Sequence, residues 1–79
     1  MKVHDLKITT VFFEAVKSGC KPFEVRINDR GFEVGDCVYL REWVNDGFTG
    51  RYLRREISFV LIGWGVEVGY VGLGFGVML

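Results

Sequence analysis

The last segment of the chain most constrains the fold, because it alternates bulky apolar residues with glycine. One set of alternate residues is apolar and the other is mostly glycine: Val71, Leu73, Phe75, Val77 and Leu79 against Tyr70, Gly72, Gly74, Gly76 and Met78. This alternation predicts a β-strand with one apolar face. Glycine weakens a strand, so a face of bare glycines needs a reason. We expect either the close approach of another backbone or a bend where a β-barrel closes.

The preceding residues predict further strands. In residues 2–8 the apolar positions are Val3, Leu6 and Ile8, with one slip in the alternation. From residue 23 the period is two, with Phe23, Val25 and Ile27 opposite Glu24, Arg26 and Asn28. Residues 37–44 and 51–62 predict two more strands, the second of them central because it is apolar on both faces. Residues 28–31 and 34–36 predict turns, and residues 45–50 predict a hairpin loop longer than the two-residue minimum.

Residues 11–18 predict a short helix that Thr9 or Thr10 caps and Gly19 ends, with an apolar stripe of Phe12, Phe13 and Val16. A helix of this length is not stable alone in water, so the stripe must pack on a sheet. We therefore expect one domain over residues 1–79. Its predicted class is α+β, mainly β with one or two short helices. Its predicted architecture is a small β-barrel of about five strands with a helix packed at one end.

Composition excludes several classes of protein. Ten basic and ten acidic side chains give no net charge, which argues against general attraction to nucleic-acid backbones. Two cysteines and one histidine are too few for a structural zinc site, and we expect no metal and no cofactor. The uncharged residues 68–79 are too few to span a bilayer, and no secretory signal is visible, so we expect a cytoplasmic protein without membrane contact. Cys20 and Cys37 then favour reduced thiols, with a single disulfide as the alternative.

The segment Gly19-Cys20-Lys21-Pro22-Phe23-Glu24-Val25-Arg26 carries the most chemical information. Glu24 and Arg26 are two residues apart and share a strand face, and Lys21 projects toward it from the preceding turn. Lys is a point charge suited to a phosphate, Arg is a rigid donor fork, and Glu accepts from amino groups. The alternative is a solvated ion pair with no ligand.

The same residues match the GxKxxExR pattern of the ASCH (activating-signal-cointegrator homology) domains of the PUA-like superfamily. The surrounding sequence resembles a subgroup of short bacterial and phage ASCH-like proteins, through residues that include His4, Leu6, Lys7, Asn28, Asp29, Arg30, Trp43, Gly69 and Tyr70. The resemblance covers nearly the whole chain. It implies a β-barrel whose motif lines a cleft between barrel and helix, and by analogy with PUA domains a site for RNA or a nucleotide-like ligand.

Other candidate ligand contacts are Lys7, Arg41, Trp43, Arg51 and Tyr70. Lys7 is expected to point into the cleft beside Lys21. Arg41 and Trp43 share a strand face that is either a stacking platform or a packed surface. Arg51 belongs to a basic cluster that either follows phosphates or blocks the pairing of an exposed strand edge. Tyr70 begins the glycine face and is either a ligand contact or part of the core.

We therefore predict a small RNA- or nucleotide-binding module. The alternative is a minimal hydrolase of the ASCH type, an acylated-cytidine amidohydrolase or a ribonuclease, in which Lys21 and Glu24 would be catalytic. The resemblance implies a hydroxyl residue where Glu24 stands, so this sequence departs from the amidohydrolase pattern. A third possibility is protein interaction, through pairing of the glycine-rich last strand with the edge of a partner.

Overall fold

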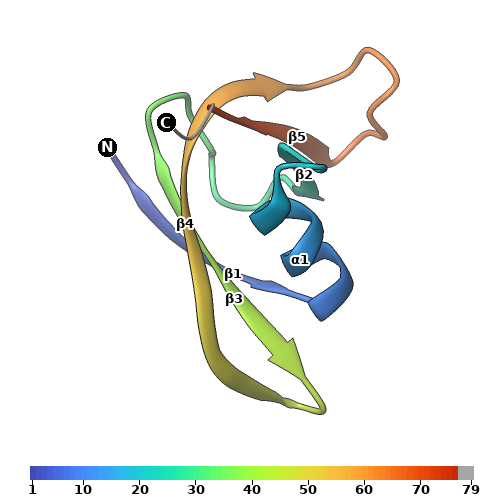
Figure 1. Cartoon of the computed structure of the whole chain (residues 1–79). Helices are drawn as coiled ribbons and strands as arrows, with labels where there is room; N and C mark the ends of the chain where they lie inside the picture. Colours follow the sequence, from blue (N-terminus) through green and yellow to red (C-terminus); the bar gives the residue numbers. More distant parts are fainter. Residues whose placement is uncertain (77–79) are drawn as a thin grey trace.

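The computed structural model describes residues 1–76, which form one helix and five strands (Figure 1). The elements are β1 (Val3–Ile8), α1 (Thr10–Ser18), β2 (Phe23–Ile27), β3 (Cys37–Val44), β4 (Gly47–Leu61) and β5 (Tyr70–Phe75). The predicted mainly-β α+β class is confirmed at this level. Val77, Met78 and Leu79, which the alternation assigned to the last strand, lie outside the described residues.

The strands form one mixed sheet in the order β1-β3-β4-β5-β2. β1 pairs in parallel with β3, and the other neighbours pair antiparallel. The long strand β4 pairs with β3 over residues 47–56 and with β5 over residues 57–61, so it is central, as predicted. Two irregularities in register, at Arg41/Trp43 and Ile57/Phe59, let the sheet bend.

The five strands do not close into the predicted β-barrel. In residues 1–76 no ladder joins β1 to β2, and these two strands are the edges of an open sheet. Closure would require β1 to exchange backbone hydrogen bonds with β2. Instead, the carbonyls of Asp5 and Lys7 on β1 accept hydrogen bonds from the Arg30 and Arg26 side chains, at 2.7 and 2.8 Å. Arginine side chains therefore occupy the edge of β1 with which β2 would have to pair to close a barrel.

The core lies between the two halves of the sheet and α1. Its buried members are Leu6, Ile8, Phe13, Val16, Phe32, Val38, Leu40, Ile57, Val71, Leu73 and Phe75. α1 begins after Thr9, whose side chain makes no capping bond, and ends at Gly19, which has a φ of 86°. Of the predicted stripe, Phe13 and Val16 are buried and Phe12 is half-exposed. α1 is the one helix in the described part of the chain, and it is too short to cross a membrane.

The glycine face of β5 has the predicted cause, close approach of a neighbouring strand. A Cβ added at Gly74 would lie 3.2 Å from the Cβ of Phe59, and one at Gly72 would lie 3.4 Å from the Cβ of Leu61. β5 pairs with β4 on one side and β2 on the other. Its edge is therefore not free to pair with a partner strand, and that form of the protein-interaction prediction is wrong.

Two local predictions are also wrong. The hairpin loop between β3 and β4 has only two residues, Asn45 and Asp46, with φ of 50° and 63°. Positive φ at both positions is the geometry of a type I′ turn, which matches the twist of the flanking strands. In β1 the buried positions are His4, Leu6 and Ile8, whereas Val3 is exposed.

Candidate functional site

β2 turns its charged face inward and its apolar face outward. Glu24 is 4% exposed, whereas Phe23, Val25 and Ile27 are 46%, 51% and 59% exposed. A buried carboxylate is costly unless charged or polar groups compensate it. Two cations do so: Lys21 Nζ donates a hydrogen bond to Glu24 Oε1, and Arg26 Nη1 lies 3.6 Å from Glu24 Oε2. The predicted convergence of Lys21, Glu24 and Arg26 is confirmed.

Backbone hydrogen bonds hold this arrangement at both ends of the turn after α1. The Lys21 N–H donates to the carbonyl of Ala15 at 3.0 Å, and the Phe75 N–H donates to the carbonyl of Pro22 at 2.9 Å. The turn is thus fixed to the helix on one side and to β5 on the other. This anchoring places Lys21 just before β2, where its ammonium reaches the Glu24 carboxylate.

The three charged groups line a hollow of about 420 Å³ between β1, β2 and the start of α1. Its other lining residues include Lys7, Thr9 and Phe12. Lys7 lies beside Lys21 in this hollow, as predicted. Each lysine also covers an aromatic ring: Lys21 Nζ lies 4.2 Å from the Phe12 ring centroid, and Lys7 Nζ lies 4.0 Å from that of Trp43. Three cations and one buried anion make the hollow locally basic in a neutral protein.

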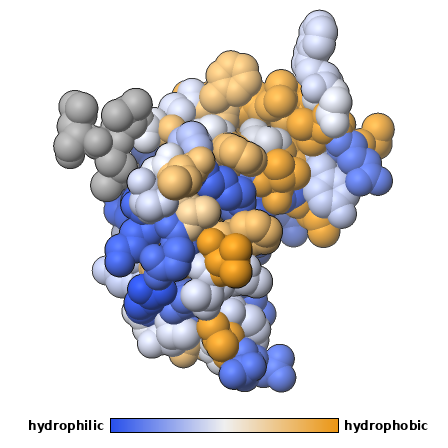
Figure 2. All heavy atoms as spheres, turned by 45° about the vertical axis from the view of Figure 1, so that its right-hand side comes forward, coloured by the Kyte–Doolittle hydropathy of each residue, from blue (hydrophilic) through white to orange (hydrophobic). Residues whose placement is uncertain are grey.

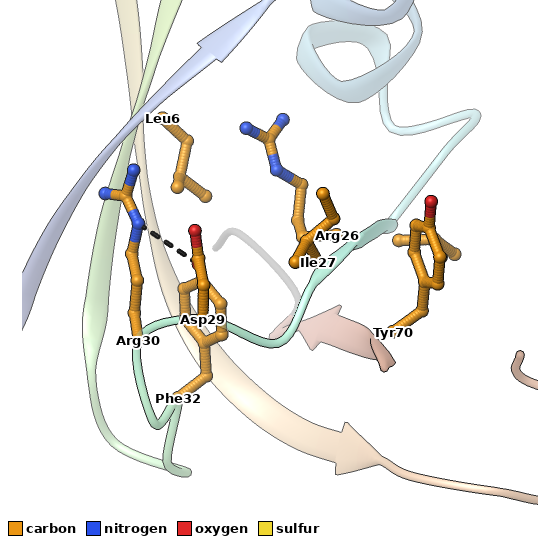
Figure 3. Close-up of a pocket in the computed structure, with 8 residues that line it drawn as sticks. Leu6, Arg26, Ile27, Asp29, Arg30, Phe32 and Tyr70 are labelled. Carbon is orange, nitrogen blue, oxygen red and sulfur yellow. Dashed lines mark ion pairs between the residues drawn. The ribbon is translucent and has the colours of Figure 1, made fainter. Parts of the chain in front are cut away.

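Arg26 connects this hollow to two more along the same edge. A hollow of about 290 Å³ is lined by Arg26, Asp29, Arg30 and Tyr70, and one of about 300 Å³ is lined by Asp5, Lys7, Arg26, Arg30, Arg41 and Phe48. We call the surface formed by these three hollows between β1 and β2 the seam. Figure 3 shows Arg26 and Arg30 in the second hollow, both pointing toward β1 with Leu6 between them. Arg30 also pairs with Asp29, at 3.5 Å.

Three other predicted contacts lie along or beside the seam. Arg41 lines the third hollow, where its Nε donates to Asp5 Oδ1 at 2.8 Å. Trp43 lies under Lys7 and packs edge-on against Phe48, with ring centroids 4.7 Å apart. Tyr70 lines the second hollow and is 38% exposed, so it belongs to the surface and not to the core.

Arg51 is not brought to the seam. Its Nε and Nη2 donate to the two carboxylate oxygens of Glu42, both at 2.9 Å, and Nη2 also donates to Glu14 at 2.6 Å. The guanidinium lies 4.3 Å from the centroid of the Phe13 ring. Arg51 therefore ties β4 to β3 and α1, and its Nε and Nη2 donors are engaged within the protein.

Two buried carboxylates stabilise the frame around the site. Hydrogen bonds from Arg51, Thr49 and Thr10 lower the pKa of Glu42 from 4.5 to about 2. The hydrogen bond with His4, followed by that from the Lys2 N–H, lowers the pKa of Asp36 from 3.8 to about 2. His4 Nε2 lies 3.0 Å from Asp36 Oδ2, so this buried histidine supports a buried carboxylate. Both carboxylates remain ionised in the folded protein at neutral pH.

Arg30 and Phe12 line the seam but were not among the predicted contacts. Arg30 follows Arg26 in a segment that the sequence marks only as a turn, and Phe12 was assigned to the packed stripe of the helix. Whether the Arg30 and Phe12 side chains are exposed depends on which strands form the edges of the open sheet. The periodicity of the sequence does not indicate this. Cys20 is exposed, Cys37 is buried, and neither forms a disulfide. Within residues 1–76 no three His, Cys, Asp or Glu side chains gather as metal ligands would.

Comparison with known proteins shows the family of the chain. Residues 3–75 match a family described as "Domain of unknown function (DUF3850)", and the chain belongs to this family. The chain is also 41% identical over 59 residues to an "Uncharacterized 12.9 kDa protein in GpA 3'region" of Escherichia phage P2. This match covers 75% of the chain and 54% of the phage protein, so the chain spans about half the length of that relative.

Proposed function

We propose that this member of the DUF3850 family binds RNA or a nucleotide-like small molecule at the seam. The observation that supports the proposal best is the first hollow, where Lys7, Lys21 and Arg26 surround a buried carboxylate. Its volume of about 420 Å³ lies within the range of roughly 300–1,000 Å³ for small-molecule sites. The resemblance to ASCH domains of the PUA-like superfamily supports the same site.

The chemistry of the hollow suits a ligand that combines an anion with a flat ring. Lys7 and Lys21 can donate to phosphate oxygens, and Arg26 can do so with a planar fork. Phe12 and Trp43 offer rings beside these cations, on which a base can stack. Glu24 holds Lys21 and Arg26 in place and can accept from an exocyclic amino group with a remaining lone pair.

The hydrolase alternative requires Glu24 to take up a proton from water or from a ribose hydroxyl. Both Glu24 oxygens face cations, Lys21 on one side and Arg26 on the other. Lys21 and Arg26 thus hold the carboxylate in place between them. The geometry therefore favours binding, with Glu24 as a positioning residue.

An NMR titration with short single-stranded RNAs and nucleoside monophosphates tests the proposal. We expect the amides of residues 7, 21, 24 and 26 to shift, and Lys21→Ala and Arg26→Ala each to weaken binding about tenfold, as expected for a lost charge-assisted hydrogen bond. Arg54→Ala removes an exposed cation away from the seam and should bind as the parent does. If Lys7, Lys21 and Arg26 neutralise three phosphates of a single strand, a plot of the log of the association constant against log[salt] should have a shallow slope of about −2.

The same samples separate the two functions. Parent-like binding by both seam variants would show that the site is elsewhere. Turnover of N4-acetylcytidine or of labelled RNA by the parent, lost in Glu24→Gln, would instead favour the hydrolase.

A further inference from the structure

The outer face of the second half of the sheet is apolar and uncovered in the described structure. It is formed by three neighbouring strands, β2, β5 and β4. The outward residues of β2 are Phe23, Val25 and Ile27, and those of β4 are Phe59 and Leu61. Figure 2, in which the right-hand side of Figure 1 comes forward, shows hydrophobic side chains gathered on the upper part of the molecule, where these strands lie. We call this surface the outer face.

The contrast with the first half of the same sheet is large. There the positions that alternate with core residues carry four charged side chains, Asp5, Lys7, Arg41 and Arg54, beside Val3, Tyr39, Trp43 and Tyr52, and Asp5 pairs with Arg41. On the outer face the positions of β2, β5 and β4 include no charged side chain. A large uncharged patch on a soluble domain marks an interaction surface. Since it offers no charge to pair, its partner must present an apolar surface as well.

The strand register suggests how the outer face could fit a second copy of itself. Gly72 and Gly74 on β5 form the floor of a trough. Phe23 and Val25 of β2 lie directly opposite Gly74 and Gly72 and form one wall, and Phe59 and Leu61 of β4 form the other. If a two-fold axis runs along the strands between β2 and β5, each copy places its β2 wall over the partner's glycine trough. Such an interface is reciprocal, as closed two-fold symmetry requires.

The apolar area exposed on the outer face is a large part of what each partner buries in a dimer interface. Phe23, Val25, Ile27, Phe59 and Tyr70 are between 38% and 61% exposed, which corresponds to on the order of 500 Å² for side chains of this size. The adjoining loop between β4 and β5 also carries exposed apolar residues, Ile62, Trp64 and Val68, at 61%, 92% and 97% exposure. A standard interface buries about 800 Å² on each partner.

We propose that a second copy of this chain covers the outer face and forms a two-fold dimer in which the two sheets pack face to face. β2 contributes its charged inward side chains to the seam, whereas the dimer uses the opposite side chains of the same strand. Three residues border both surfaces, because Val25, Ile27 and Tyr70 also line hollows of the seam. The proposed dimer does not rest on the proposed function, and its test needs no ligand.

Sedimentation equilibrium of the whole chain, from about 1 to several hundred μM, tests the dimer. We expect the mass to rise from monomer to dimer. Phe59→Glu should raise the dissociation constant at least about 100-fold, because each copy would bury an unpaired carboxylate. Tyr52→Glu is the matched control, since Tyr52 lies on β4 with 55% exposure against 61% for Phe59, but outside the outer face. It should associate as the parent does.

Other outcomes would overturn the proposal. These are a parent that stays monomeric throughout, a Phe59→Glu variant that associates like the parent, or a monomeric parent that sediments with phosphatidylcholine vesicles, which would make the outer face a lipid-binding surface. If circular dichroism shows that Phe59→Glu is unfolded, Phe59→Ser decides. The Phe59 side chain is 61% exposed, so the loss of its ring should leave the fold intact and weaken association about tenfold or more.

Discussion

The two glycines that form the floor of the trough allow a direct test of why β5 carries them. Gly72 and Gly74 lie two residues apart on one strand, face the same way, and neither has a positive φ. An alanine is therefore allowed by the backbone at both positions. What differs is the space, because the added Cβ would lie 3.4 Å from the Leu61 Cβ at position 72 but 3.2 Å from the Phe59 Cβ at position 74.

Gly72→Ala should be neutral or stabilising by about 0.5 kcal/mol, since alanine loses less backbone freedom on folding than glycine and the new contact is close to ordinary. Gly74→Ala gains the same entropy but forces Phe59 or β5 to move by a few tenths of an ångström. Such overpacking costs about 1–3 kcal/mol. Phe59 cannot retreat easily, because two residues earlier the backbone of Ile57 is held by Gly35 and Asp36 at 2.9 and 2.8 Å.

The difference between the two variants should therefore be at least about 1 kcal/mol, or roughly 4–8 °C in melting temperature for a domain of this size. Thermal and urea unfolding at low micromolar concentration measures it with little contribution from association. If Gly74→Ala is as stable as Gly72→Ala, close approach of β4 is not the reason for the glycines, and the account of the trough fails.

Two further predictions concern the frame of the fold. Asp36 and Glu42 have folded pKa values of about 2 against ordinary values of 3.8 and 4.5, so the unfolded chain binds protons first as the pH falls, and the free energy of unfolding should decrease between about pH 5 and pH 2. Each carboxylate contributes up to about one proton to the slope of the unfolding free energy against pH. In urea unfolding, Asp36→Asn and Glu42→Gln should therefore show a weaker dependence of stability on pH than the parent. Profiles parallel to the parent's would contradict the assigned hydrogen bonds. In the β3–β4 turn, Asp46→Gly relieves a φ of 63° and should stabilise the protein by about 0.5–1 kcal/mol in thermal unfolding, whereas Asp46→Ala should give no gain. Equal melting temperatures for these two variants would argue against a type I′ turn.

Local patterns predicted the elements of this fold better than their long-range arrangement. The strands, the short helix, its glycine end and the central place of β4 follow from periodicity and turn chemistry, which depend on neighbouring residues. The open sheet does not follow from them. Whether β1 meets β2 depends on the parallel pairing of β1 with β3 and on Arg26 and Arg30 binding the edge of β1. These contacts join residues 19 and 25 positions apart, and no local pattern reports them.

The candidate site shows the same division. The spacing of Lys21, Glu24 and Arg26 was enough to predict that they converge, because residues i and i+2 of a strand share a face. It was not enough to place Arg51, which is as basic as Arg26 but meets Glu42 and Glu14 when β4 packs beside β3 and α1. Which arginine faces a ligand and which holds the fold depends on where buried carboxylates come to lie.

β2 connects the two proposed surfaces, and its composition is best explained by them. None of its five residues belongs to the hydrophobic core, although three of them are large and apolar. A strand selected for stability alone would bury Phe23, Val25 and Ile27 and expose Glu24 and Arg26. The reverse arrangement costs the desolvation of a carboxylate on one side and the exposure of three apolar side chains on the other. Both costs are recovered if the inner side positions cations for an anionic ligand and the outer side is buried against a second copy of the chain.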